Sequence, residues 1–113
     1  MAQRQKESSL VPIDPAEALQ RIGGEPAFLE ELLNLYLEEF VTRTEVLRKA
    51  IEKEDFSLIQ EVGHSLKGSS ANLSLKALEN ASSEMEMAGR AKNLPKAKST
   101  LVILKDEFKR LKD

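Results

Sequence analysis

The sequence contains a single histidine, His64, with neighbours that suit the transfer of an anionic group. If this segment is a helix, turning by about 100° per residue, His64 lies well off the apolar stripe. Lys67 follows three residues later and therefore lies beside the imidazole. Its positive charge favours the neutral, nucleophilic ring and would attract an arriving phosphoryl group. A lone histidine is more often an ordinary surface or core residue, so the pattern alone leaves both interpretations open.

Gly68, one turn after His64, strengthens the hypothesis of a transfer site. Glycine inside a helix costs about 1 kcal/mol relative to alanine, and no turn or cap requires it because the apolar pattern continues to Leu73. The missing side chain would leave the imidazole accessible and let another surface approach. Ala71 is small and lies on the same face, and Gln60 lies near the histidine on the preceding turn.

Composition excludes several other kinds of chemistry. The 113 residues include no cysteine, which excludes disulfides, thiolate catalysis and cysteine–zinc sites, and one histidine cannot form a two-histidine metal site. A net charge of −2 gives no general attraction to nucleic acid or acidic membranes. No apolar run approaches the roughly 18 residues of a membrane span, and the N-terminus lacks the apolar core of a signal peptide. We therefore expect one cytoplasmic domain with no metal site, no membrane contact and no nucleic-acid partner.

The elements that must position these residues begin after a polar segment. Residues 1–12 are polar and mostly aperiodic and predict a flexible tail, which leaves residues 13–113 as the folded domain. Asp14 followed by Pro15 predicts the start of a short helix, because an aspartate can cap it and proline suits its first position. Gly23-Gly24 is expected to end that helix.

Four longer amphipathic helices are expected to follow. The first runs from Pro26 to about Lys53, and the next three begin at the side-chain caps Asp55 and Ser74 and near Asn93. No segment alternates as a strand would. The chain is therefore predicted to be all-α, an antiparallel four-helix bundle with a short additional N-terminal helix.

Charge is distributed unevenly along these helices. Acidic residues predominate from 27 to 61 and basic residues from 90 to 113. These segments are either solvated helix faces or a bipolar surface that steers a charged partner. The basic C-terminal helix has one aromatic residue, Phe108, and it falls on the apolar stripe, unlike a nucleic-acid-binding surface. Because no long apolar face is left over once four helices pack, we expect a monomer.

The segment from His64 to Leu73 (HSLKGSSANL) closely resembles the signature of histidine-containing phosphotransfer (HPt) domains of multistep phosphorelays. The resemblance implies a histidine that accepts a phosphoryl group from a receiver-domain aspartate or a sensor or hybrid histidine kinase. The group then passes to a response-regulator aspartate. On this resemblance His64 is the phosphoacceptor, Lys67 the stabilising cation and Gly68 the clearance for the receiver. Glu86 stands where the family commonly carries a polar residue near the histidine, and antiparallel pairing through the turn near Ser74 is expected to put it close to His64 as well.

Two positions depart from the pattern of that family. Ser74 stands where the family usually has glycine, so the turn between the third and fourth helices is expected to differ. Gly63 stands where the family usually has alanine, and its place on the helix indicates close packing rather than chemistry. Neither departure removes a residue that the transfer requires.

Phosphoryl transfer depends mostly on positioning and charge neutralisation. The sequence has no glycine-rich nucleotide-binding loop, so we expect no phosphorylation from ATP and no kinase activity in this chain. The chain would need no cofactor of its own, because the receiver partner would bring the aspartate and Mg²⁺. The ring nitrogen that does not carry the phosphoryl group should stay protonated and hydrogen-bonded, to water, Gln60 or Glu86.

Two apolar residues of the long helix, Leu35 and Val41, are candidates for a docking surface, and they fit core positions equally well. The alternative function is a non-catalytic adaptor bundle in which His64 is incidental. That alternative explains the fold and leaves Gly68 unexplained.

Overall fold

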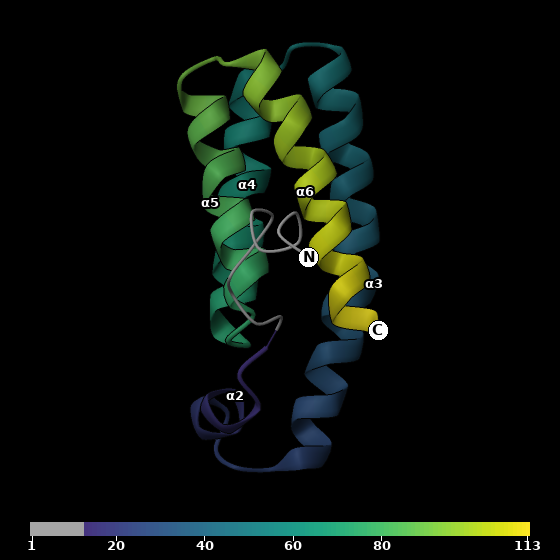
Figure 1. Cartoon of the computed structure of the whole chain (residues 1–113), viewed down its shortest axis with the longest axis vertical. Coiled ribbons are helices and arrows are strands. Elements are labelled where there is room, and N and C mark those ends of the chain that lie inside the picture. The colour runs from purple at the N-terminus through teal and green to yellow at the C-terminus, as the bar shows by residue number, and fades with distance from the viewer. Residues whose placement is uncertain (1–12) are drawn as a thin grey trace, which may run out of the picture.

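The computed structural model describes residues 13–113 and contains five helices there and no strand. They are α2 (Pro15–Arg21), α3 (Pro26–Glu52), α4 (Phe56–Asn72), α5 (Lys76–Arg90) and α6 (Leu94–Lys112). Figure 1 shows the four long helices side by side, with the short α2 at one end of the molecule. The prediction of an all-α chain is confirmed for this part of the sequence. The tail predicted for residues 1–12 lies outside the described residues.

Two of the three predicted helix caps are present, and Asn93, predicted only as the start of a helix, is a further cap. Side-chain oxygens of Asp14, Asp55 and Asn93 accept hydrogen bonds from backbone N–H groups in the first turns of α2, α4 and α6. The oxygen-to-nitrogen distances are 3.1, 3.2 and 3.1 Å. Each cap satisfies one of the N–H groups that a helix leaves unpaired at its start.

The predicted cap at Ser74 is wrong, because the end of α4 determines the conformation of this residue. Ser74 has a φ of +56°, and α5 begins after an N-cap at Leu75 that makes no side-chain hydrogen bond. The N–H of Leu75 donates to the carbonyl of Ser70 (2.9 Å) and that of Ser74 to the carbonyl of Ala71 (3.0 Å). This is the left-handed closure of a helix end, a position that glycine adopts with least strain. Ser74 adopts this left-handed conformation although it is not a glycine.

The same turn joins α3 to α4 and α5 to α6. Glu54 and Lys92 have φ values of +56° and +54° and close their helices with the same pair of backbone hydrogen bonds. Each of the three connections therefore has a left-handed residue followed directly by the N-cap residue of the next helix. Such short connections bring successive helices next to one another.

The apolar stripes of the helices meet in one core. The largest fully buried apolar side chains are Phe40, Leu47, Ile59, Leu66, Leu75, Leu78, Met85 and Leu104. Between α3 and α6, the rings of Phe40 and Phe108 stack with centroids 4.1 Å apart. Between α3 and α4, the buried hydroxyl of Tyr36 lies 2.7 Å from Ser70 Oγ, close enough for a hydrogen bond. Burial raises the pKa of Tyr36 to about 12, although the hydrogen bond with Ser70 lowers it in part.

Two glycines let α4 and α5 approach each other closely. A Cβ atom at Gly63 would lie 2.6 Å from the backbone nitrogen of Glu86, and one at Gly89 would lie 2.7 Å from Cα of Gln60. Neither position has room for a side chain unless the helices separate. The packing role expected for Gly63 is confirmed, whereas Gly89 was not anticipated from the sequence.

Candidate phosphoacceptor site

His64 lies on α4 with its side chain 73% exposed, off the core as predicted. Its Nδ1 lies 2.9 Å from Oε2 of Glu86 on α5. A carboxylate can only accept a hydrogen bond, so we infer that Nδ1 carries the proton and donates it. In the neutral ring, Nε2 then has a free lone pair, which makes it the nucleophilic nitrogen.

Glu86 is the buried partner of this exposed histidine. Its side chain is 9% exposed, and it also receives Lys67 Nζ at 3.4 Å and Arg90 Nη2 at 3.4 Å. Burial alone would raise the pKa of Glu86, but the hydrogen bond from His64 and the charge of Lys67 together lower it below its usual value. The carboxylate is therefore ionised at neutral pH and holds the ring in one orientation.

The close helix contact described above places this carboxylate. Gly63 precedes His64 in α4 and lies against the backbone of Glu86 in α5. Because the two backbones are this close, the side chain of Glu86 is long enough to reach the imidazole of His64, the residue after Gly63. Gly63 thus affects the imidazole only through the position of Glu86.

Gly68 leaves the surface beside His64 open. It lies in α4 and is exposed, and a Cβ atom built on it would meet nothing within 4 Å. The space it leaves is therefore available to another molecule rather than filled by this chain. This is the geometry that clearance for a partner requires.

Gln60 and Ala71 are the remaining predicted site residues on α4. Gln60 lines a shallow hollow together with His64 and Glu86, while the ring nitrogen is bonded to Glu86. Ala71 is half-buried in the last turn of α4, where its carbonyl accepts the N–H of Ser74. Of the alternatives left open for the second ring nitrogen, the structure has the bond to Glu86.

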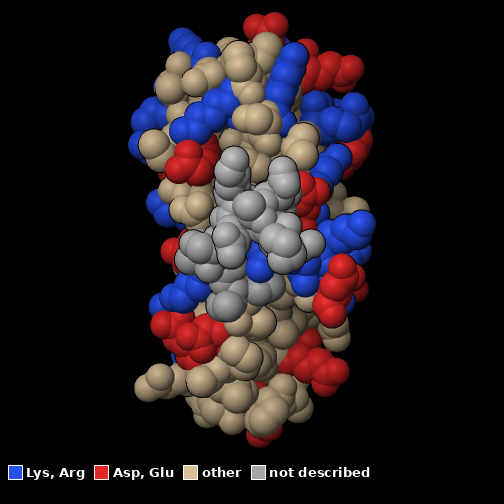
Figure 2. Space-filling model, viewed as in Figure 1, with Lys and Arg blue, Asp and Glu red and all other residues tan. Residues whose placement is uncertain are grey.

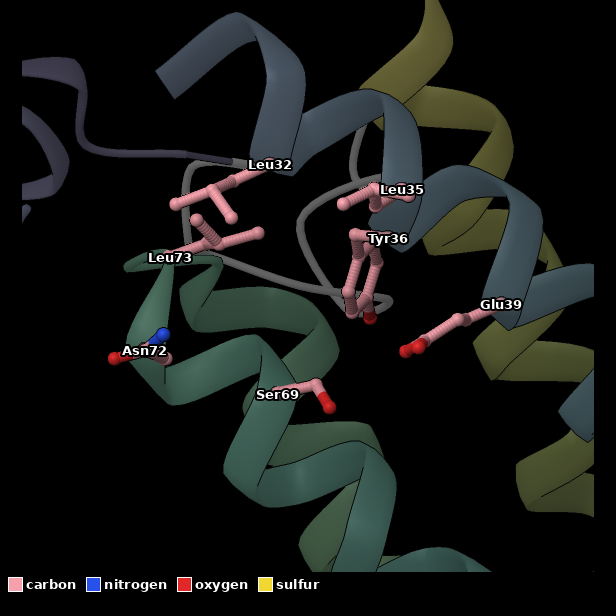
Figure 3. A pocket seen from close by; sticks show the side chains of 7 residues that line it. All are labelled: Leu32, Leu35, Tyr36, Glu39, Ser69, Asn72 and Leu73. Atoms are coloured by element: carbon pink, nitrogen blue, oxygen red, sulfur yellow. The ribbon is translucent and has the colours of Figure 1, made fainter. Parts of the chain in front are cut away.

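Leu35 and Val41 are both exposed and lie on different sides of α3. Their exposed fractions are 55% and 59%, so neither belongs to the core. Leu35 lines a groove against α4 with Ser69 and Asn72, as Figure 3 shows. Six residues on a helix correspond to a rotation of about 240°, which places Val41 about 120° away from Leu35. The structure therefore brings Leu35, and not Val41, against α4.

Arg90 was not anticipated from the sequence as a member of the site. It follows Glu86 by four residues on α5, the spacing at which side chains of one helix meet. That spacing is visible in the sequence, but it has meaning only once Glu86 is known to lie beside His64. With Lys67, Arg90 gives the carboxylate two cationic neighbours.

Two further observations concern residues 13–113 only. They contain no group of three or more histidine, aspartate or glutamate side chains placed to hold a metal ion. Within the same residues, none of the helices combines the length and the apolar character needed to cross a membrane.

The fold and the site together define an all-helical module with an exposed histidine whose Nδ1 is hydrogen-bonded to the buried carboxylate of Glu86. A family model described as the Hpt domain matches residues 31–113, and the chain therefore belongs to the Hpt domain family. The match begins within α3 and includes every residue of the site. A search of curated proteins gave no significant match, and a search of solved structures gave none either.

Proposed function

We propose that this chain is a phosphorelay intermediate. His64 accepts a phosphoryl group from a receiver-domain aspartate or a histidine kinase and passes it to a response-regulator aspartate. Membership of the Hpt family supports phosphotransfer in two-component relays in general. The observation that carries the specific proposal is the exposed imidazole whose Nδ1 is bonded to the buried Glu86.

The transfer is an in-line exchange of one bond for another. The lone pair of His64 Nε2 attacks the phosphorus, the P–O bond to the donor aspartate breaks, and the aspartate leaves as a carboxylate. The imidazole gains positive charge as the P–N bond forms, and Glu86 stabilises it through the Nδ1 proton. Lys67 neutralises charge on the phosphoryl oxygens, while Gly68 gives the partner room to approach.

This chain would supply the nucleophile and its setting, and the partner the rest. Mg²⁺ bound by the receiver would neutralise the phosphoryl group during transfer. We propose no ATP-dependent kinase activity, no cofactor held by the chain itself and no nucleic-acid or membrane partner. The proposed location is cytoplasmic and the proposed state monomeric.

The proposed architecture is an antiparallel four-helix bundle of α3 to α6 within a domain of residues 13–113, with α2 as an additional short helix. The three short connections between successive long helices support it. We also propose that a receiver docks across α4 over Gly68, with Gln60 and Ala71 at the edges of the contact. Leu35 extends that surface onto α3, and Val41 is the weaker candidate because of its different side.

Incubation with a receiver domain carrying ³²P-phosphoaspartate tests this function. The chain should take up label that is labile in acid and stable in base, as phosphohistidine is, and His64→Gln should take up none. If His64→Gln takes up label, or the parent chain takes up none from any receiver, the proposal fails and the adaptor alternative stands.

Gly68→Leu separates the site from the fold. We expect slower transfer from receivers with unchanged helix content by circular dichroism, because the side chain would fill the open space beside His64. Transfer at the parental rate would show that clearance is not the role of Gly68.

A further inference from the structure

A groove between α3 and α4 contains exposed apolar surface that the transfer chemistry does not use. Leu32, Leu35, Tyr36 and Leu73 line it, with the polar residues Glu39, Ser69 and Asn72. In Figure 3, Leu32 and Leu73 face each other across the groove, and the carboxylate of Glu39 points toward it. Leu35 is 55% exposed, so its apolar surface is available to a partner at the edge of the groove.

Glutamates surround Leu35 on its own helix. Glu31 precedes it by four residues, and Glu38 and Glu39 follow it by three and four, so all three lie within one turn of it. All three side chains belong to exposed residues. Leu35 is therefore an exposed apolar residue surrounded by three glutamates, Glu31, Glu38 and Glu39, which we call the acidic rim.

These three carboxylates differ from those at the other end of α3. Among residues 13–113, Glu31, Glu38 and Glu39 form no ion pair within 4.0 Å, whereas Glu45 and Glu52 both pair with Arg48. On the face in Figure 2, where α5 and α6 lie in front, Lys and Arg gather toward the end where α5 meets α6. Among the described residues the acidic rim therefore has no ion-pair partner, and Arg43, which lines a hollow with Glu38 and Glu39, forms no ion pair with them.

The groove and His64 can be covered by one partner. On α4, His64 and Ser69 lie about 140° apart around the helix, with Gly68 and Ser65 between them. Gly68 leaves open space above the helix. A partner seated over Gly68 would meet His64 at one edge and the Leu35 groove at the other.

We infer that Leu35 and its rim, Glu31, Glu38 and Glu39, determine which receivers this chain serves. The occupant is a receiver domain that presents an apolar side chain to the groove, flanked by Lys or Arg. Exposed carboxylates without an ion-pair partner around an apolar contact favour a basic partner and repel an acidic one, which gives specificity and faster association. This inference rests on the proposed function and adds the chemistry of the partner.

The experiment begins with the chain phosphorylated chemically, so that no docking is needed to load it. Phosphoramidate transfers its phosphoryl group to the imidazole nitrogen and releases ammonia. The loaded chain is then mixed with purified receiver domains that differ in charge around their acceptor aspartate, at low and at high salt. The loaded fraction is measured for each variant, so that slow transfer can be assigned to docking rather than to His64.

We expect the parent chain to prefer receivers with a basic surface beside the acceptor aspartate. The triple variant Glu31→Lys, Glu38→Lys and Glu39→Lys should transfer to them about tenfold more slowly at low salt, and the difference should shrink at high salt. The matched control is Glu52→Lys, Glu54→Lys and Asp106→Lys, which changes the net charge equally at sites away from the groove. Lysine is compatible with position 54, because Lys92 has the same backbone conformation.

Two results would overturn the inference: parental rates in the rim variant, or equal slowing in the control. If the rim variant transfers at parental rates and also loses a dimer, the occupant of the groove is a second copy of this chain. Failure of the loaded parent chain to pass its phosphoryl group to any receiver is a different result. It would refute the proposed function itself.

Discussion

On its two sides, α4 meets its neighbours in different ways. Toward α5 the backbones are so close that Gly63 and Gly89 have no room for a side chain, and this contact brings Glu86 to His64. Toward α3 the contact consists of large side chains, includes the buried bond between Tyr36 and Ser70, and leaves a groove at Leu35. The α5 side holds the imidazole of His64 in one orientation, and the α3 side leaves an exposed groove; under the proposed function the first would fix the nucleophile and the second would receive the partner.

This difference separates two requirements of phosphoryl transfer between proteins. The nucleophile must be held within a narrow range of geometry, which rigid close packing provides. The docking surface must bind one partner and reject others, and exposed side chains together with carboxylates that have no ion-pair partner can provide this selectivity. The following predictions test whether the two sides of α4 divide the work in this way.

The largest effect on stability is expected for Gly63→Ala. The new Cβ atom would lie 2.6 Å from the backbone nitrogen of Glu86, so we expect the free energy of unfolding to fall by about 3 kcal/mol. The same substitution at Gly68 is the control, since it meets nothing within 4 Å and should raise the free energy by up to about 1 kcal/mol. Urea denaturation of both variants measures the difference. Equal changes at the two positions would contradict the close contact of α4 with α5.

The next effect concerns transfer rather than folding. Glu86→Ala removes the acceptor that orients the ring of His64, a charge-assisted hydrogen bond of roughly 1.5–3 kcal/mol. We expect phosphotransfer from a receiver to slow by about tenfold or more. Glu86→Gln should retain part of the rate, because its amide oxygen can still accept the Nδ1 proton. Single-turnover kinetics with labelled receiver would measure these transfer rates. A parental rate in Glu86→Ala would refute the positioning role of Glu86.

A smaller effect is expected on the α3 side. Tyr36→Phe leaves the fully buried Ser70 hydroxyl without its partner, so we expect a loss of about 1–2 kcal/mol in the free energy of unfolding. Adding Ser70→Ala removes the orphaned hydroxyl and should recover part of that loss. If the double variant loses at least as much free energy of unfolding as the two single variants added together, the hydrogen bond between Tyr36 and Ser70 does not couple α3 to α4.

The smallest effect concerns pH and Glu86. The pKa of Glu86 is lowered in the folded protein. Its ionisation therefore stabilises the fold at a pH above the ordinary glutamate pKa of about 4.3, and this stabilisation is lost as the pH falls through the folded pKa. The stability difference between the parent chain and Glu86→Gln should therefore be present at neutral pH and disappear on acidification. Urea titrations of both proteins at several pH values would measure it. A difference that grows toward acid would mean that the folded pKa is raised instead.

Sequence periodicity could predict the helices and the exposure of His64, because both depend on local spacing. The caps at Asp14, Asp55 and Asn93 were predictable for the same reason. Ser74 was misread because a serine before a helix fits a cap pattern, while the end of the preceding helix imposes a left-handed backbone there.

The contacts between helices were less accessible from sequence. Glu86 was expected near His64 from the family resemblance and from antiparallel pairing of two helices, whereas its partner Arg90 and the close contact at Gly89 were not anticipated. These depend on how near two backbones come, which one helix's periodicity does not contain. The groove at Leu35 likewise depends on which side of α3 meets α4.

The central claim is that His64 accepts a phosphoryl group on Nε2 while Glu86 holds Nδ1. A ¹⁵N–³¹P correlation spectrum of the ¹⁵N-histidine-labelled chain, loaded from a phosphorylated receiver, tests it directly. We predict a single phosphorus signal coupled to Nε2 of His64. A phosphorus coupled to Nδ1, or a loaded chain with no phosphorus on the ring, would contradict the account.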